Sequence, residues 1–248
     1  MIDIHAHILP GLDDGARDME TALAMAEMAG ESGVRTIVAT PHCNLPGNRP
    51  NFWDETLQRT FSAVCRAVHS ANIPVEILPG MEIFGTPEVP ELLRTGKLIP
   101  LAGSRYPLIE FPFGNYGQQA TEILAEVTAL GFRPIVAHPE RYHYVQQSPA
   151  LLNRWVALGC LLQVNKGSLL GRFGPAEEAM ALELLDRGFV SFLASDAHSP
   201  IVRTPWMADV RDLVADEYSE ALARQLLETN PRTLLEGRDV ETAEPEWF

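Results

Sequence analysis

The feature that most constrains the fold is a regular alternation of short apolar runs with longer, helix-like stretches. The apolar runs are rich in aliphatic and β-branched residues and predict seven strands: Ile2–His5, Val34–Thr40, Val75–Met81, Tyr106–Phe111, Pro134–Ala137, Cys160–Val164 and Val190–Ala194. Amphipathic stretches, several ending at glycine, predict helices over Asp18–Ser32, Glu55–Ser70, Gln118–Leu130, Pro149–Leu158, Pro175–Arg187 and Pro205 to about Glu228, with a break near Glu217. Because such alternation builds parallel βαβ units, we expect an α/β fold.

The length of 248 residues fits one domain, 1–248, and an α/β barrel of about this size is common. With seven strands, closure into a barrel is favoured over an open sheet, although the sequence alone leaves the open form possible. A further strand over Lys97–Leu101 could pair with Tyr106–Phe111, and the acidic tail after Gly237 is expected to be poorly ordered. In a barrel of this kind the active site lies at the C-terminal ends of the strands.

The composition excludes several classes of function. A formal net charge of −14 repels nucleic acids and anionic membranes, so no nucleic-acid partner is expected. An anionic substrate would need local positive charge from metal ions or arginines. No apolar run is long enough to insert into a membrane, and the first residues do not resemble a signal peptide. Three irregularly spaced cysteines favour a reducing compartment, so the expected location is the cytoplasm.

Residue types that bind metals follow nearly every predicted strand. In chain order they are His5, His7, Asp13, Asp14, His42, Glu82, Glu110, His138, Asn165, Lys166, Asp196 and His198. If the strands form a barrel, these side chains point into one mouth. They exceed the three protein ligands of a single catalytic ion, so two or three divalent ions are implied. Imidazole and carboxylate together suit manganese, iron or zinc.

Each position also has a simpler interpretation. A single histidine or carboxylate after a strand is often only a satisfied polar residue or a helix cap, and Asp13 and Asp14 could be turn residues before Gly15. The joint pattern is more specific, because five of the seven histidines fall at strand ends. His69, on a predicted helix, is interpreted as structural. Arg141 and Arg203 follow two of these positions and could bind a phosphate bidentately, although surface salt bridges would explain them equally well.

A second signature competes with the metal hypothesis. The spacing from Cys43 to Arg49 matches the Cys-x5-Arg loop of cysteine-dependent phosphatases, which need a thiolate at the base of a cradle of backbone N–H groups. Pro46 removes one such N–H, and Pro50 replaces the hydroxyl residue that usually follows the arginine. The metal hypothesis is therefore preferred.

Seven motifs together resemble the polymerase and histidinol phosphatase (PHP) superfamily, and within it the bacterial capsule-locus tyrosine phosphatases of the CpsB/CapC group. The motifs are MIDIHAHILPGLDDGA, ATPH, GMEIF, LIEFP, AHPERY, QVNKGSL and ASDAHSPIVR, and the resemblance runs from Met1 to about Leu235. It implies a distorted (β/α)7 TIM-like barrel, the PHP fold, with three metal ions that are often manganese. The loop CNLPGNRP after His42 departs from the group, whose members are more basic there, and this bears on substrate choice.

The resemblance also implies roles for individual residues. The first ion would be held by His5, His7, Glu82 and Asp196. Glu82 would bridge to a second ion held also by Glu110 and His138. A third ion would be held by Asp14, His42 and His198. Arg141 and Arg203 would bind the phosphate of phosphotyrosine.

The expected function is therefore hydrolysis of phosphotyrosine by metal-activated water, without a covalent phosphoenzyme. Asp14, Glu110 or a metal-bound water could protonate the leaving phenolate. The implied partner is a phosphotyrosine protein, namely a bacterial tyrosine autokinase that controls capsule or exopolysaccharide synthesis. Two alternatives stay open at this point: a small-molecule phosphomonoesterase such as a histidinol phosphatase, and a metal-binding protein without enzymatic activity. The oligomeric state is not predicted.

Overall fold

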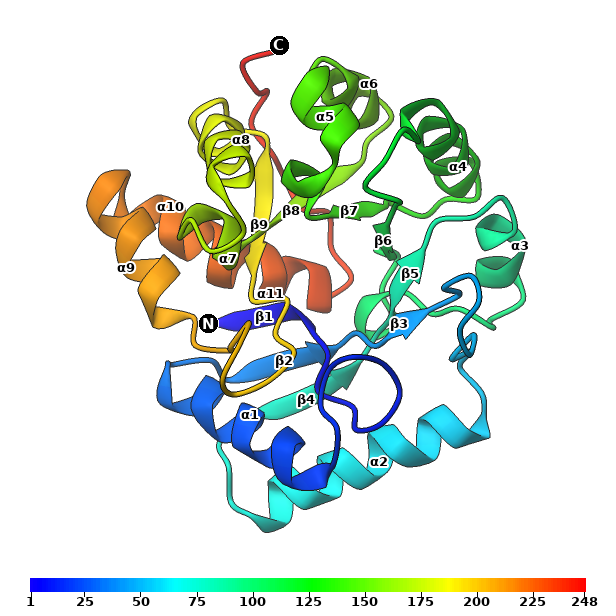
Figure 1. Ribbon diagram of the computed structural model, residues 1–248, viewed down its shortest axis with the longest axis vertical. Coiled ribbons are helices and arrows are strands. Elements are labelled where there is room, and N and C mark those ends of the chain that lie inside the picture. Colours follow the sequence, from blue (N-terminus) through cyan, green and yellow to red (C-terminus); the bar gives the residue numbers. More distant parts are fainter.

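The structure, a computed structural model, describes residues 1–248 and contains nine strands that pair only in parallel. The strands are β1 (Ile2–Ala6), β2 (Thr36–Ala39), β3 (His42–Cys43), β4 (Glu76–Pro79), β5 (Glu82–Phe84), β6 (Leu108–Glu110), β7 (Ile135–Ala137), β8 (Leu161–Asn165) and β9 (Val190–Ala194). One sheet has the order β1-β2-β4, and the other has the order β3-β5-β6-β7-β8-β9 (Figure 1). The strands thus follow one another around the fold in chain order.

Two of the predicted strands are each divided into two short pieces. The second predicted strand ends as β2 and resumes after Pro41 as β3, and the third ends as β4 and resumes after Gly80 as β5. Gly80 is needed at this break because a Cβ there would lie 2.7 Å from Cγ1 of Val38. Counting each divided strand once gives the seven expected strand positions, and the fold is a distorted TIM-like α/β barrel.

The first and last strand positions meet at their C-terminal ends. Ala6 and Ala197 form a parallel bridge, the N–H of Asp196 donates to the carbonyl of His5 at 2.9 Å, and that of His7 donates to the carbonyl of Ala197 at 2.8 Å. These hydrogen bonds tie the loop after β9 to the loop after β1. Residues from opposite ends of the chain therefore lie side by side at the rim where the active site is expected.

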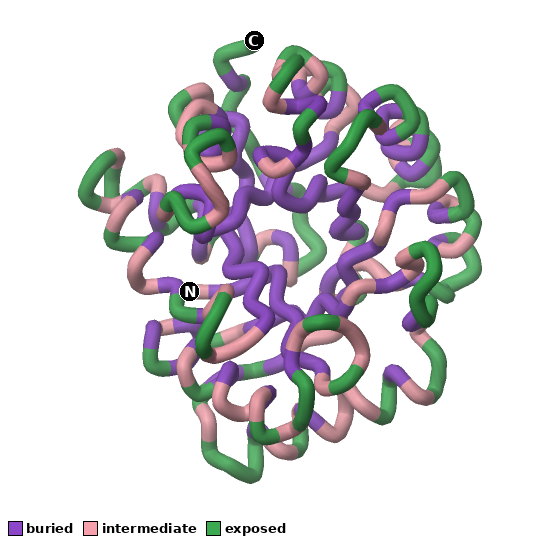
Figure 2. Tube along the Cα trace, viewed as in Figure 1, coloured by how far each residue is buried: buried purple, intermediate pink, exposed green.

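Helices surround the strands, and buried residues concentrate at the centre (Figures 1 and 2). The longer helices are α1 (Met19–Glu31), α2 (Glu55–Ser70), α4 (Gly117–Ala129), α6 (Leu151–Ala157), α8 (Pro175–Asp186) and α9 (Ala208–Glu217). The shorter ones are α3 (Val89–Arg94), α5 (His143–Gln147), α7 (Lys166–Leu169), α10 (Glu220–Arg224), a π-helical turn η3 (Gln225–Thr229) and α11 (Asn230–Leu235), with 3₁₀ turns η1 (Leu101–Gly103) and η2 (Pro139–Arg141). None of the helices combines the length and the apolar character that a membrane span requires.

Three sequence-based expectations need comment. The predicted strand Lys97–Leu101 is wrong: the Lys97 carbonyl instead accepts a hydrogen bond from the Trp53 N–H at 2.8 Å, and the segment ends in η1. The last long helix starts later than predicted, at α9, but breaks as expected after Glu217. The tail after Gly237 is ordered rather than loose, because Val240 is buried and its N–H and carbonyl are hydrogen-bonded to the barrel.

Candidate active site

The structure brings all nine side chains that were expected to bind metals into one cluster. They fall into four overlapping groups whose ligand atoms lie within 4.8 Å of one another: His7, Asp14, His42 and His198; His5, His7 and Asp196; His5, Glu82 and His138; and His42, Glu82 and Glu110. Seven of the side chains come from the C-terminal end of a strand or from the loop that follows it, and His42 and Glu82 begin the short strands β3 and β5 that follow β2 and β4. Parallel strands therefore gather residues that are up to 193 positions apart, from His5 to His198, into one mouth.

The deepest group surrounds a point between β1 and the loop after β9. Nε2 of His5 lies 3.3 Å from Nε2 of His7 and 3.4 Å from Oδ1 of Asp196, and Nε2 of His7 lies 3.4 Å from the same oxygen. Glu82 is 3.2 Å from each imidazole. Two ligand atoms bound to one ion at about 2.0–2.1 Å are separated by about 2.9–3.4 Å, so these spacings fit a shared ion.

A second group is centred on the two glutamates. Nε2 of His138 lies 2.9 Å from Oε1 of Glu82 but 3.9 Å from Oε2 of Glu110. Nδ1 of His42 is nearer to both carboxylates, at 2.9 Å from Glu82 and 3.1 Å from Glu110. His42 therefore borders this group as well as the one in which the sequence motifs had placed it.

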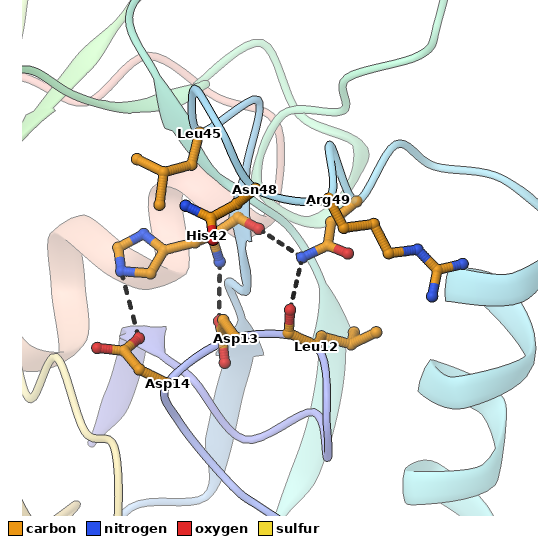
Figure 3. A pocket seen from close by; sticks show the side chains of 8 residues that line it. Leu12, Asp13, Asp14, His42, Leu45, Asn48 and Arg49 are labelled. Carbon is orange, nitrogen blue, oxygen red and sulfur yellow. Dashed lines mark hydrogen bonds and ion pairs between the residues drawn. The ribbon is translucent and has the colours of Figure 1, made fainter.

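A third group lies nearer the surface. Oδ1 of Asp14 is 3.3 Å from Nε2 of His198 and 3.5 Å from Nε2 of His42. Figure 3 shows the Asp14 and His42 side chains pointing toward one another from the loop after β1 and from β3. Asp14 is the most exposed of the nine side chains, at 65%, so this group is the part of the cluster that a substrate meets first.

Hydrogen bonds fix the orientation of three of the imidazoles. Nδ1 of His5 contacts Oε1 of Gln163 at 2.8 Å, Nδ1 of His7 contacts Oδ2 of Asp13 at 2.8 Å, and Nδ1 of His198 contacts the carbonyl of Asp196 at 2.9 Å. These acceptors require a proton on Nδ1, which leaves the Nε2 lone pair of each ring directed into the cluster. Supporting contacts of this kind set the tautomer of histidines that bind metals.

Sequence reasoning missed Gln163, which is fully buried on β8. Its amide donates at 2.8 Å to Oδ1 of Asn165, whose own amide donates at 2.6 Å to Oδ2 of Asp196. A polar residue two positions before Asn165 in an otherwise apolar strand was the available signal, because alternate residues share a face. Lys166, by contrast, does not point into the cluster, since its Nζ contacts Thr204 at 3.4 Å and Asp209 at 3.7 Å.

Several polar atoms of the cluster are buried and lack a hydrogen-bond partner. They are Nδ1 of His42, Oε2 of Glu82, Nδ1 of His138, Oδ1 of Asp196 and Nε2 of His198. Nδ1 of His42 and Oε2 of Glu82 approach to 2.9 Å, yet they are not aligned as donor and acceptor. Leaving such atoms unsatisfied costs about 1–3 kcal/mol each, so their convergence fits residues that bind cations.

The carboxylates give the cluster a strong preference for positive charge. Burial opposes ionisation of Glu82, but His5 and His42 outweigh it and hold the Glu82 pKa well below its ordinary value. Burial likewise disfavours the His42 cation, but Glu82 and Glu110 outweigh it and raise the pKa of His42 to about 10. A divalent cation that displaces these protons would meet ionised oxygens already in position.

Arg141 and Arg203 border the cluster on the side of β7 to β9. Nη1 of Arg141 is 3.3 Å from Oδ2 of Asp196, and Arg203 forms an ion pair with the same carboxylate. The guanidinium of Arg141 lies between two rings, 4.8 Å from the centroid of Phe113 and 4.6 Å from that of Phe173, and the guanidinium of Arg203 is 5.8 Å from the Phe173 centroid. These rings hold both planar cations beside the cluster.

Three residues of the cluster adopt backbone conformations that are unusual for residues other than glycine. His138, Asp196 and Arg203 have φ angles of 34°, 50° and 52°. Such left-handed conformations cost about 1 kcal/mol or more each and are found at functional sites, where the surrounding structure enforces them. Here they turn the chain sharply after β7 and β9 and aim all three side chains at the same region.

The competing cysteine signature lacks the chemistry it needs. The Cys43 side chain is buried and its Sγ contacts the carbonyl of Glu82 at 3.4 Å. Burial and the neighbouring carboxylates Glu82 and Glu110 raise the pKa of the Cys43 thiol well above its ordinary value. A nucleophilic thiolate requires the opposite environment.

From the sequence, Asp13 could be a turn residue or one of the polar residues of the site, and in the structure it takes part in both. Oδ1 accepts the N–H of Gly15 at 2.9 Å, as a turn residue does, while Oδ2 holds Nδ1 of His7 and accepts the N–H of His42 at 2.9 Å. Gly15 lets this turn lie against β1, since a Cβ there would be 2.2 Å from the carbonyl oxygen of His7.

Replacing Gly15 by alanine is therefore expected to push the turn away from His7. We expect a loss of about 1–3 kcal/mol of folding free energy, the range for overpacking of buried sites, together with a lower metal content. Chemical denaturation and elemental analysis measure the two effects. The control is Gly114→Ala, where, as at Gly15, φ is acceptable for alanine but no atom lies within 4 Å of the new Cβ. A Gly15→Ala protein as stable as that control would contradict the prediction.

Comparison with known proteins agrees with this geometry. The family model described as "Capsular polysaccharide synthesis, CpsB/CapC" matches residues 1–236. The chain belongs to the CpsB/CapC family. The tyrosine-protein phosphatase YwqE of Bacillus subtilis (strain 168) is 35% identical over 242 residues, which cover 97% of this chain and 93% of that protein. The tyrosine-protein phosphatase CpsB of Streptococcus pneumoniae is 30% identical over 243 residues, covering 95% and 98%.

Solved structures extend the agreement to three dimensions. A chain from the crystal structures of YwqE from Bacillus subtilis and CpsB from Streptococcus pneumoniae, described as metal-dependent tyrosine phosphatases, matches with a TM-score of 0.93 at 33% identity and covers 100% of this chain and 99% of its own. A histidinol phosphate phosphatase from Lactococcus lactis matches with a TM-score of 0.57 at 12% identity, covering 90% of this chain and 93% of its own, which shows a shared fold. The expected membership of the CpsB/CapC group is thus confirmed.

Proposed function

We propose that this chain is a metal-dependent protein-tyrosine phosphatase. The single observation that supports it best is the convergence of five imidazoles and four carboxylates beside two arginines, of which Arg141 lies between two aromatic rings and Arg203 lies near one of them. A purely structural metal site has no use for two cations that border it. The names of its CpsB/CapC relatives agree with this chemistry.

The proposed metal centre holds two or three divalent ions, with manganese as the first candidate and iron or zinc as alternatives. Its proposed ligands are His5, His7, Asp14, His42, Glu82, Glu110, His138, Asp196 and His198. Bound ions would polarise the phosphoryl group and lower the pKa of water, so that hydrolysis can proceed at neutral pH without a cysteine nucleophile.

The chain's own residues have distinct tasks in this proposal. Arg141 and Arg203 would donate N–H groups to the equatorial oxygens of the phosphoryl group and compensate their charge in the transition state. Gln163, Asn165 and Asp13 would keep the ligands in place. Asp14 lies at the exposed edge of the cluster, where the leaving phenolate would stand, but its hydrogen bond with His198 lowers its pKa, so this ionised carboxylate would orient a proton-donating water rather than donate a proton itself.

The physiological partner proposed for this chain is a phosphotyrosine protein, namely a bacterial tyrosine kinase that controls capsule or exopolysaccharide synthesis. The family description places CpsB/CapC proteins in capsular polysaccharide synthesis, which supports this choice. The proposed location is the cytoplasm, in agreement with three free cysteines and no disulfide.

Removal of the metals is expected to abolish hydrolysis of a phosphotyrosine peptide, and addition of Mn²⁺ to restore it, whereas Cys43→Ser should retain activity within about threefold. The reason is that Cys43 is a buried, protonated thiol that is not among the proposed metal ligands. Phosphate release is measured with and without chelator, and histidinol phosphate is assayed in parallel. Chelator-resistant activity that Cys43→Ser abolishes would refute the metal mechanism. A clear preference for histidinol phosphate would refute the tyrosine phosphatase assignment.

A further inference from the structure

A pocket of about 490 Å³ opens beside the exposed edge of the cluster, and no role has yet been given to it. It is lined by Leu12, Asp13, Asp14, His42, Leu45, Asn48, Arg49 and Asn51 (Figure 3). Asp14 and His42 belong to the cluster itself, so the pocket is continuous with the place where the phosphoryl group would be hydrolysed. The remaining residues come from the loop after β1 and from the loop after β3.

Arg141 and the pocket lie on opposite sides of the cluster. Arg141 follows β7, whereas the pocket is built after β1 and β3; Arg203 follows β9, and the loop after β9 is tied to the loop after β1. A phosphoryl group held by Arg141 would direct its ester oxygen away from β7, toward the pocket. The pocket is then the space available to the leaving group of the phosphoester.

The two loops that form the pocket are joined by a buried residue. Asn51 is 7% exposed, and its amide donates at 2.9 Å both to the carbonyl of Leu12 and to that of His42. The N–H of Asn44 closes the second loop by donating to the carbonyl of Pro50 at 2.8 Å. These hydrogen bonds therefore fix the position of the pocket wall relative to the cluster.

Arg49 is the only arginine or lysine in this pocket, and it forms no hydrogen bond or ion pair within the chain. Its side chain extends away from Asp14 and His42, toward α2 (Figure 3). It therefore cannot hold the phosphoryl group at the cluster, but it can meet a residue that neighbours the phosphotyrosine. Leu12 and Leu45 supply apolar surface within the same pocket, of the kind that a phenyl ring contacts.

We infer that this pocket is the peptide subsite of the enzyme: the tyrosyl ring lies against Leu12 and Leu45, and Arg49 pairs with an acidic side chain next to the phosphotyrosine. The inference rests on the proposed phosphatase function. Charge complementarity supports it, because an unpaired arginine in a chain of net charge −14 attracts a carboxylate where most of the surface repels one. The occupant is thus an acidic phosphotyrosine peptide.

The test compares two peptides that differ only by Asp or Asn beside the phosphotyrosine. The wild-type enzyme should prefer the Asp peptide in kcat/KM by about two- to fivefold, the factor expected for one solvent-exposed ion pair. Arg49→Ala should reduce this ratio to one, and Arg49→Glu should invert it in favour of a Lys peptide. The matched control is Arg59→Ala on α2, an exposed arginine paired with Glu55, which should retain the wild-type ratio.

Binding is measured independently of turnover by fluorescence anisotropy, with the same peptides carrying a non-hydrolysable difluoromethylphosphonate in place of the phosphate. The same order of affinities is expected, and it should fade in high salt. Equal affinity of the wild-type protein for the Asp and Asn peptides, or an unchanged preference in Arg49→Glu, would overturn the subsite while leaving the phosphatase function standing. Failure to hydrolyse any phosphotyrosine substrate would overturn both.

Discussion

Replacing Glu82 by glutamine is expected to abolish nearly all phosphatase activity and to reduce the metal content of the protein. Glu82 is fully buried, and its two carboxylate oxygens contact four imidazoles: His5 at 3.2 Å, His7 at 3.2 Å, His42 at 2.9 Å and His138 at 2.9 Å. The amide keeps the shape of the side chain but removes the negative charge. Loss of this shared charge should lower kcat by about 10²–10³-fold, the effect of removing one group that stabilises transition-state charge.

The Glu82→Gln effect is measured as kcat on a phosphotyrosine peptide and as ions per chain by elemental analysis. Glu126→Gln, an exposed glutamate on α4, is the matched control and should behave as the wild type. Circular dichroism verifies that both variants are folded. A Glu82→Gln enzyme with full metal content and activity within tenfold of the wild type would show that Glu82 does not bridge ions.

The second large effect is expected at the two arginines. Arg141→Ala and Arg203→Ala should each lower kcat/KM by about 10²–10³-fold, as removal of one donor to transition-state charge does in other enzymes. Both side chains contact Asp196, and both lie near the ring of Phe173. Because they would bind the same phosphoryl group, the double variant should lose less than the product of the single losses.

Two further variants make the arginine prediction specific. Arg141→Lys keeps the charge but loses the planar fork between the two phenylalanines, so we expect it to recover only part of the activity. Arg154→Ala, an exposed arginine on α6, is the control and should be neutral. Steady-state kinetics on a phosphotyrosine peptide compares all of them. Wild-type kcat/KM in both single variants would exclude the proposed binding of the phosphoryl group by these arginines.

The convergence of these residue types at one rim could be read from the sequence, because residue type and strand position are both encoded locally. Each of the nine residues follows an apolar strand, and parallel strands end at the same rim, so the existence of one cluster followed from the strand pattern. The distribution of ligands among ions did not follow. His42 borders two groups because β3 is a separate short strand after Pro41, and no local pattern specifies where its ring lies between them.

The residues that sequence reasoning missed act over long distances in the chain. Gln163 meets His5 from a position 158 residues away, and Phe173 reaches Arg141 and Arg203 from the loop after α7. Neither glutamine nor phenylalanine is a residue type that by itself indicates a role in a metal or phosphate site. The ordered tail is a similar case, because Val240 is held by hydrogen bonds with Tyr106 and Arg133, both more than 100 positions earlier in the chain.

The sequence by itself determined the alternating α/β architecture, the metal-binding character of the strand ends and the family, since these depend on local periodicity and on residue types at fixed spacing. Only the tertiary structure decided which imidazole nitrogen faces the cluster, that the Cys43 thiol is buried beside carboxylates, and that Arg49 stands free beside a pocket. The physical reason is that folding brings together neighbours that are distant in the chain. These neighbours set the tautomers, the pKa values and which donors are left without a partner.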